Sequence, residues 1–254
     1  MSAPAWASVD AARAASGLRL VLGRAIPGPW SVAARAIFEL KGIPYIAVPH
    51  DAGMPNDEVR EWTGQASAPI AVLDNDRPRA NWSEILLLAE TLQPEPPLIP
   101  ADPRQRMEMF GLAHEICAED GLGWVLRALL FAMQAEAGSL AMPTLLAKYG
   151  SRHTIAHYSR RLNEVIGLLA ELLTAQKCVG SRYFVGDRLS AADIYWAAFS
   201  NLLHPMAPEA CIMPDFVREI PAQIAPHLLA PLSPALIAHR DYVVDTYIQT
   251  PICM

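Results

Sequence analysis

The chain lacks the features by which membrane-spanning, exported and nucleic-acid-binding proteins are recognised. No stretch among its 254 residues reaches about 18 uninterrupted apolar side chains, so we predict no transmembrane helix and no membrane partner. The N-terminal residues include Asp10 and Arg13 and lack a basic start followed by a long apolar run, which makes them a poor signal peptide. No run of Lys and Arg opposes the net charge of −6, so we expect no nucleic-acid partner.

Cysteine is scarce, and no two cysteines stand in a CxxC pair. The four cysteines are widely separated, which argues against a disulfide framework and favours reduced thiols in a cytoplasmic protein. A metal centre is not expected either: His153 and His157 have a spacing that suits ligands on a helix, but no third ligand accompanies them. Charged residues make up only 18% of the chain and apolar residues 52%, many of them Ala and Leu, which is typical of helical bundles.

Apolar periodicity separates an α/β part from a helical part. Within residues 18–92, short β-rich runs alternate with stretches of helical periodicity. A strand, a helix and a strand within about thirty residues imply a right-handed βαβ unit with a parallel strand pair. The full order predicts a thioredoxin-like domain, preceded by a loose arm over residues 1–17. The predicted elements are strand 18–22, a helix with apolar spacing over 32–40 that Lys41-Gly42 closes, strand 45–48, helix 57–62, strands 70–73 and 79–82, and a helix capped by Ser83 that runs to about Leu92.

A proline-rich linker joins this domain to the helical one. Residues 93–103 contain five prolines, a density that excludes helix and indicates a stiff connection. The pattern of residues 104–254 is helical, with one helix or two over 104–135 and further helices over 143–175, 190–203 and 233–247. The predicted fold class is therefore α/β plus all-α, with an N-terminal thioredoxin-like domain and a C-terminal helical bundle.

The strongest local signal is the start of the helix at residue 190. Ser190 suits the N-cap, and Asp193 stands three residues later, where its carboxylate can reach back as in a capping box. Leu189 and Ile194 flank the turn as a hydrophobic staple. Because the residues that follow are too apolar for a surface helix, we predict that this helix is buried.

The string around this capping box, Gly-Asp-x-Leu-Ser-x-Ala-Asp-Ile over residues 186–194, resembles the motif that opens the central helix of the C-terminal domain in glutathione transferases. With the domain order, the resemblance covers nearly the whole chain. It implies the glutathione transferase fold, glutathione as co-substrate and a homodimer. Pro69 precedes the third predicted strand, where thioredoxin-like folds have a cis proline. The resemblance implies that Pro69 is cis and that the Ala68 backbone pairs with the cysteinyl backbone of glutathione.

The resemblance also places the γ-glutamyl end of glutathione at the helix that starts near Ser83. Its hydroxyl and the free N–H groups of the first turn would form an anion site. The family usually has an acidic residue directly before this Ser, and here Trp82 stands in that place. Glu84 follows one position late and can take over the contact with the ligand amine, or else is a solvated residue of the first turn. Since Ser83 would anchor a charged group, we expect activity to depend more on Ser83 than on Ser31.

The predicted active-site turn is Gly28-Pro29-Trp30-Ser31. Members that exchange disulfides have Cys at the first place, and many transferases have Ser or Cys there. With Gly28 at that place, no thiolate is available, and disulfide exchange through this motif is excluded. Ser31 is the candidate catalytic hydroxyl, although it can instead satisfy the backbone. Arg24, before the turn, is a candidate positive charge for a ligand or an ordinary surface residue.

The leading functional hypothesis is a glutathione transferase that conjugates the thiolate of glutathione to a small hydrophobic electrophile. The alternative is a non-catalytic glutathione- or ligand-binding or interaction protein that keeps the fold and lacks the usual active-site Ser, Cys or Tyr. Aromatic and apolar residues of the predicted helices are candidates either for the electrophile site or for the core: Trp124, Met133, Tyr149 and Tyr158.

Overall fold

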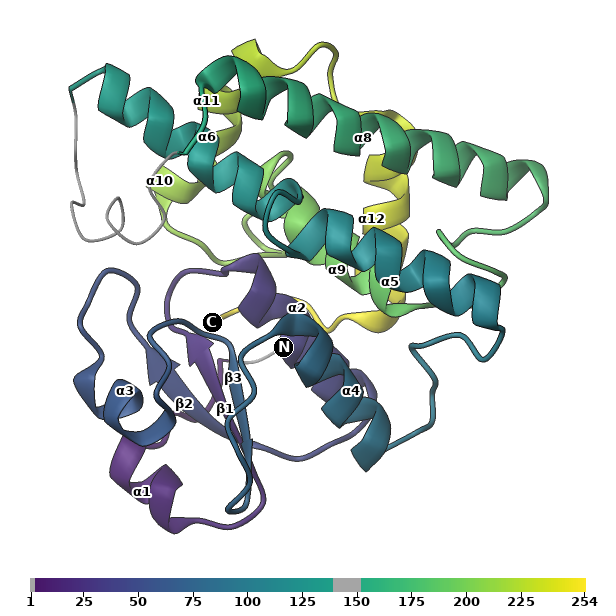
Figure 1. The fold of residues 1–254 in the computed structure, drawn as a ribbon. Coiled ribbons are helices and arrows are strands. Elements are labelled where there is room, and N and C mark those ends of the chain that lie inside the picture. The colour runs from purple at the N-terminus through teal and green to yellow at the C-terminus, as the bar shows by residue number, and fades with distance from the viewer. Residues whose placement is uncertain (1–2, 139–151) are drawn as a thin grey trace.

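A three-stranded mixed sheet forms the centre of the N-terminal part of the computed structural model, which describes residues 3–138 and 152–254. The central strand β1 (Leu18–Gly23) pairs in parallel with β2 (Ile46–His50) and antiparallel with β3 (Ile70–Leu73). Helices α2 (Pro29–Leu40) and α4 (Trp82–Leu92) cover one face of the sheet (Figure 1). Helices α1 (Val9–Ala14) and α3 (Asp57–Thr63) cover the other.

The alternation of side chains along β1 produces these two layers. Leu18, Leu20 and Leu22 pack with the side chains of α2 and α4, whereas Val21 points to the opposite face and packs with α1 and α3. The sheet is therefore apolar on both faces. This arrangement confirms the predicted class of the N-terminal part.

The N-terminal arm is not loose, in contrast to our expectation. Ser8 caps α1, and the Ala7 N–H donates to the Ala47 carbonyl on β2 at 2.9 Å. Val9 and Ala12 are buried against the sheet. These two residues form only one apolar turn, which is too short for apolar periodicity to predict a helix. The helix is stabilised by packing against the apolar face of the sheet.

The predicted fourth strand is also wrong. Only a single bridge between Ala71 and Arg79 forms at that edge of the sheet. Pro78 has no N–H to donate to a ladder, and Asn81 already caps α4 by accepting from the Ser83 N–H at 2.9 Å. The helix thus begins at Trp82, and Ser83 lies inside its first turn rather than at the cap.

The C-terminal part is helical (Figure 1). The predicted helical run over 104–135 is divided in two at Gly121, the N-cap of the second helix. The predicted helix start at Pro143, like Tyr149, lies outside the described residues. The described helices are α5 (Pro103–Cys117), α6 (Leu122–Glu136), α8 (Ile155–Cys178), α9 (Ala191–Phe199), α10 (Asp215–Arg218), α11 (Ile220–Ile224) and α12 (Pro234–Tyr247), with 3-10 turns at Ser200–Leu202 and Ala225–His227.

Helix α9 lies at the centre of the helical part, and all nine of its residues are buried. The predicted capping box is confirmed. Both the N–H and the hydroxyl of Ser190 donate to Oδ2 of Asp193 at 2.8 Å. Oδ1 of the same carboxylate accepts from the Phe184 N–H at 2.9 Å and lies 3.1 Å from Nε2 of His239 on α12. One buried carboxylate therefore joins three segments of the chain.

The linker is held to both parts. Lys41, whose side chain is fully buried, donates through Nζ to the carbonyls of Gln93 and Pro96 at 2.8 Å and pairs with Glu90 at 2.7 Å. The Leu98 carbonyl accepts from Ala191 at the start of α9. These contacts connect α2, the linker and α9 in one continuous packing unit.

The C-terminal tail returns from α12 to α2. Nη1 of Arg35 donates to the Cys253 carbonyl at 2.6 Å. The Ala25 N–H, in the loop between β1 and α2, donates to the Met254 carbonyl at 2.9 Å. The tail thereby positions the loop that leads into α2.

Removing the Asp193 carboxylate will destabilise the protein far more than removing the Ser190 hydroxyl. Ser190→Ala loses one cap contact, so we expect a loss of about 1 kcal/mol in the free energy of unfolding. Asp193→Ala leaves the buried N–H groups of Phe184 and Ser190 without their acceptor and removes the carboxylate beside His239, so we expect about 3–5 kcal/mol. Urea denaturation of both variants and of the double variant measures this, and the two effects will be non-additive because the side chains share a contact. Equal midpoints for the wild type and Asp193→Ala would contradict the role of this carboxylate.

Candidate functional site

A cleft of about 460 Å³ lies at the N-terminal end of α2, where the two parts of the chain meet. The loops after β1 and β2 and the segment before β3 line it from the N-terminal part, and α6 lines it from the helical part. The lining residues are Gly23, Arg24, Ile26, Gly28, Trp30, Ser31, His50, Ala52, Gly53, Met54, Pro55, Ala66, Ser67, Ala68, Arg127 and Phe131.

The predicted active-site turn lies in this cleft. Gly28 is the N-cap of α2 and offers no side-chain cap, and Pro29 follows at the first helical position. Ser31 lines the cleft although only 4% of it is exposed, and its Oγ accepts from the Gly23 N–H at 3.1 Å. A hydroxyl that accepts one hydrogen bond keeps its own O–H to donate. Ser31 therefore both fixes the loop after β1 and offers a donor next to the helix start.

The Ala68–Pro69 peptide bond is cis, as predicted. Ala68 lines the cleft together with Ala66 and Ser67. The structure thus brings Ala68 and Ser31 to one cavity, from two different segments of the N-terminal part.

The residues predicted to bind the γ-glutamyl end of glutathione do not line this cleft. Among the described residues that line the cleft, Trp82, Ser83 and Glu84 are absent. The Ser83 hydroxyl donates to Oδ1 of Asn81 at 2.8 Å, and Glu84 pairs with Arg77 at 2.7 Å.

Trp82 faces the helical part instead. Its ring packs edge-on against Tyr195 with centroids 5.6 Å apart and also lies near Phe110. The Tyr195 hydroxyl donates to the Trp82 carbonyl at 3.3 Å. Trp82 therefore makes an apolar contact between the two parts of the chain.

The ionisable side chains of the cleft are basic. They are Arg24, His50 and Arg127, and the described lining includes no Asp or Glu. Arg24 is held by both carboxylate oxygens of Asp51, at 2.8 and 2.6 Å, and this neighbour raises the pKa of its guanidinium. The N-terminus of α2 adds partial positive charge and backbone N–H groups without helical partners. The cleft is therefore suited to an anionic ligand.

Sequence reasoning missed the wall that α6 contributes. Arg127 and Phe131 are one turn apart and both line the cleft, whereas the predicted Trp124 does not line it. Trp124 instead packs against Trp30 with ring centroids 6.3 Å apart. The spacing of these residues marks one face of α6, but nothing local indicates that this face meets the start of α2.

Trp30 connects the cleft to the core of the helical part. Its indole Nε1 donates to the Cys117 carbonyl at 2.9 Å, and its ring packs against Phe199 on α9 at 4.7 Å. Cys117 does not supply a reactive thiolate near the cleft, because complete burial raises the pKa of its thiol well above the usual value.

The remaining candidates are structural. Tyr158 is buried, and its hydroxyl accepts from the N–H groups of Arg152 and His153. Met133 packs against the main core. The rings of His153 and His157 stack at 4.3 Å, and the described residues contain no group of three or more His, Cys, Asp or Glu side chains that could hold a metal ion.

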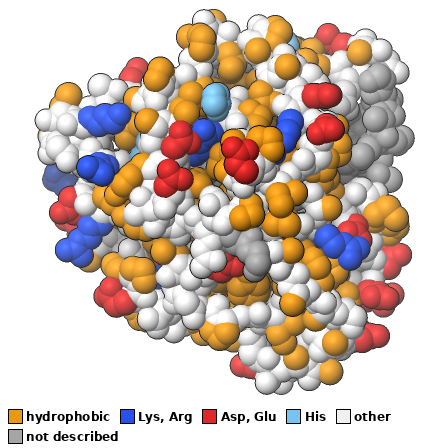
Figure 2. All heavy atoms as spheres, turned by 180° about the vertical axis from the view of Figure 1, so that it is seen from behind, with side chains coloured by type: hydrophobic (Ala, Val, Ile, Leu, Met, Phe, Trp, Pro, Cys, Tyr) orange, Lys and Arg blue, Asp and Glu red, His pale blue; other side chains and the backbone are white. Residues whose placement is uncertain are grey.

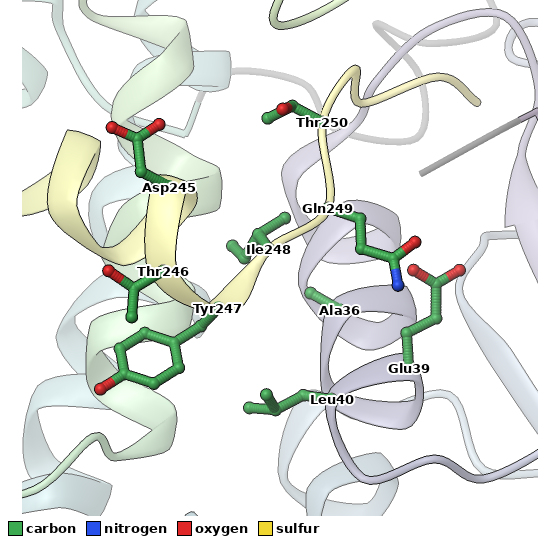
Figure 3. Close-up of a pocket in the computed structure, with 9 residues that line it drawn as sticks. All are labelled: Ala36, Glu39, Leu40, Asp245, Thr246, Tyr247, Ile248, Gln249 and Thr250. Carbon is green, nitrogen blue, oxygen red and sulfur yellow. The ribbon is translucent and has the colours of Figure 1, made fainter.

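A second cavity of about 570 Å³ lies at the other end of α2, against the end of α12 and the tail (Figure 3). Its lining includes the acidic Glu39 and Asp245. Glu39 pairs with Arg35 at 2.7 Å and accepts from the Tyr45 hydroxyl at 2.9 Å. Burial, together with this carboxylate, raises the pKa of Tyr45 to about 12. An anionic ligand fits the first cleft better than this one.

On the face seen from behind, Lys and Arg side chains are scattered among Asp and Glu (Figure 2). Neither sign of charge dominates this face. In the part of the chain that the structure describes, no helix combines the length and apolar character needed to cross a membrane.

Solved structures share this fold along most of the chain, although no family model and no curated protein sequence matches it. A glutathione S-transferase from Methylobacillus flagellatus with glutathione bound has a TM-score of 0.65 at 13% identity, covering 94% of this chain and 100% of its own. One from Methylobacterium radiotolerans, in complex with glutathione sulfonate, has a TM-score of 0.63 at 17% identity, covering 94% and 95%. A beta-etherase from Sphingobium sp. has a TM-score of 0.58 at 20% identity, covering 89% and 99%. The chain has the glutathione S-transferase fold, which confirms the fold that the sequence motifs implied.

Adding a methyl group at Gly123 will disturb the packing of Trp30, which lines the cleft. A Cβ there would lie 2.8 Å from Cδ1 of Phe199 and 2.8 Å from Cη2 of Trp30. We expect Gly123→Ala to lower the free energy of unfolding by about 1–3 kcal/mol through overpacking. Gly111→Ala in α5 is the matched control, since a Cβ there has no neighbour within 4 Å. We expect this control to stabilise the protein by about 0.5–1 kcal/mol because helical Gly is replaced by Ala. Thermal or urea unfolding separates the two, and a stabilising Gly123→Ala would contradict the close packing.

Proposed function

We propose that the protein binds glutathione in the cleft at the start of α2 and conjugates its thiolate to a small hydrophobic electrophile. The observation that carries this proposal is the composition of the cleft: three basic side chains and no described acidic one, at a helix N-terminus, on a glutathione S-transferase fold. Glutathione carries two carboxylates and reacts as a thiolate, so a basic cleft suits both its binding and its ionisation.

Each lining segment has a role in this proposal. The Ala68 backbone pairs with the cysteinyl backbone of glutathione, and the first turn of α2 faces the sulfur. The Ser31 O–H and the backbone N–H groups of that turn stabilise the thiolate and lower its pKa. The thiolate then attacks the electrophilic carbon, the leaving group departs with its electron pair, and the thiol proton passes to water. Holding both reactants in the cleft supplies most of the acceleration.

The geometry argues against the residues that we expected to bind the γ-glutamyl end of glutathione. Ser83 and Glu84 would meet the ligand only after giving up their contacts with Asn81 and Arg77. Ser31 already lines the cleft. We therefore now rank Ser31 above Ser83 for activity, which reverses the order expected from the sequence.

Kinetics of two serine variants test this ranking. Glutathione affinity is measured by calorimetry, and turnover is measured with an electrophile against the spontaneous rate. We expect Ser31→Ala to lower kcat about 10–100-fold, because a hydrogen bond to a charged group contributes about 1.5–3 kcal/mol. Ser83→Ala, the matched control, should change kcat by less than about twofold, since its hydroxyl is bound to Asn81.

Unfolding curves of both variants are measured in the same experiment. They separate a loss of stability from a loss of activity, because Ser31 also accepts a hydrogen bond from the Gly23 N–H. A Ser83→Ala variant that loses glutathione binding while Ser31→Ala keeps full turnover would restore the original order.

A non-catalytic binding protein is the second candidate, favoured by Gly28. This position caps α2 without any side-chain contact, so the usual stabilising group is missing. Measurable glutathione affinity without conjugation above the spontaneous rate would select this candidate. A lack of both glutathione affinity and conjugation would reject the transferase and leave a binding protein for another ligand.

We also propose that the protein is a cytoplasmic homodimer. The free thiols of its four cysteines suit a reducing compartment, and the family resemblance of residues 186–194 implies the homodimer. Sedimentation at micromolar concentration should give a species of twice the 27.7 kDa mass of the chain. A single species at the mass of one chain would contradict the homodimer.

A further inference from the structure

We propose that the electrophile is a flat apolar molecule that carries a carboxylate, and that Arg127 binds this carboxylate. The proposal rests on the proposed function, because it concerns the second substrate of the same cleft. The first observation is that both parts of the chain line the cleft. Ala66, Ser67 and Ala68 line it from the N-terminal part, whereas Arg127 and Phe131 line it from α6. A ligand that lies along Ala68 leaves the α6 wall to the second substrate.

The Arg127 guanidinium is held by aromatic rings. Its central carbon lies 4.6 Å from the ring centroid of Trp30 and 5.3 Å from that of Trp124. Trp30 is in turn fixed by its hydrogen bond to the Cys117 carbonyl. Stacking of this kind restrains a long side chain before any ligand arrives, so less conformational entropy is lost on binding. The planar fork of donors then suits a carboxylate in a two-point contact.

The apolar side chains that line the cleft suit a flat apolar body. Phe131 lies one turn further along α6, and Ile26, Trp30 and Met54 line the cleft as well. Apolar and aromatic side chains favour a planar ring by burial and by edge or face contacts. Met54, at 64% exposure, lies at the open side of the cleft, where such a ring would cover it.

The positive charge of the cleft favours an electrophile that carries a carboxylate over a neutral one. No acidic side chain belongs to the described lining, so a carboxylate meets no like charge from the cleft wall. A neutral ring gains only apolar contacts there, whereas a carboxylated ring gains a charge-assisted hydrogen bond as well. Arg127 therefore acts as the residue that sets specificity between the two.

A matched pair of chloronitroarenes tests the proposal: 1-chloro-2,4-dinitrobenzene, which is neutral, and 4-chloro-3-nitrobenzoate, which has a carboxylate. In both reactions a carbon–sulfur bond forms, the carbon–chlorine bond breaks, chloride leaves with the electron pair and the thiol proton goes to water. The quantity measured is the ratio of kcat/KM for the benzoate to kcat/KM for the neutral arene, corrected for the spontaneous rates.

We expect Arg127→Met to lower this ratio about 10–100-fold, mainly through the KM of the benzoate. Arg127→Lys keeps the charge and should lower the ratio less. Arg106→Met is the matched control, because Arg106 also lies over a ring, 5.2 Å from the centroid of Phe110, but does not line the cleft. The control should leave the ratio unchanged.

An unchanged ratio in Arg127→Met would overturn the proposal. So would a loss confined to glutathione affinity, since Arg127 would then belong to the glutathione site. If the wild type binds no glutathione, the proposed function fails separately. Quenching of tryptophan fluorescence by 4-chloro-3-nitrobenzoate, compared between the wild type and Arg127→Met, still decides whether Arg127 binds the carboxylate, and equal affinities would refute it.

Discussion

The buried carboxylate of Asp193 is the interaction on which the rest of the structure depends. It accepts hydrogen bonds from Ser190 and Phe184 and lies beside His239, so it joins the start of α9 to the preceding loop and to α12. A charge in this position is tolerated because each oxygen has close polar partners. The helix that begins at this carboxylate, α9, is buried along its whole length and packs against α2.

Helix α2 connects the buried helix α9 to the cleft. It lies between the sheet and α9, and most of its residues are buried although it belongs to a small domain (Figure 1). Its one buried arginine, Arg35, is satisfied by Glu39 and by the carbonyl of Cys253 in the tail. The cleft forms where the N-terminus of α2 meets α6, and the close approach of Gly123 to Trp30 makes this meeting possible. Its chemistry is therefore shared between the two parts of the chain.

The cleft combines a turn that offers no side-chain donor at Gly28 with basic side chains on its walls. Ser31 and the N-terminus of α2 offer donors on one side, and Arg127 adds positive charge from α6. Arg24 contributes less, because Asp51 already neutralises it. Binding of an anion follows from this composition more directly than catalysis does, since binding needs only favourable charge and shape, whereas catalysis needs a donor placed at the reacting atom.

The sequence alone predicted most of the strands and helices, the capping box at Ser190 and Asp193, and the lack of a thiol at residue 28. These features depend on neighbours within one or two helical turns or within one strand, so the local pattern suffices. The cis bond before Pro69 followed from the family resemblance and not from the local pattern. Tertiary structure decided the rest. It placed Arg127 and Phe131 in the cleft, turned Trp82 toward Tyr195, and docked α1 on the sheet. It also showed that Asn81, rather than Ser83, caps α4. Periodicity identifies which face of a helix is apolar, but the face that it meets belongs to residues far away in the chain, and only packing brings the two together.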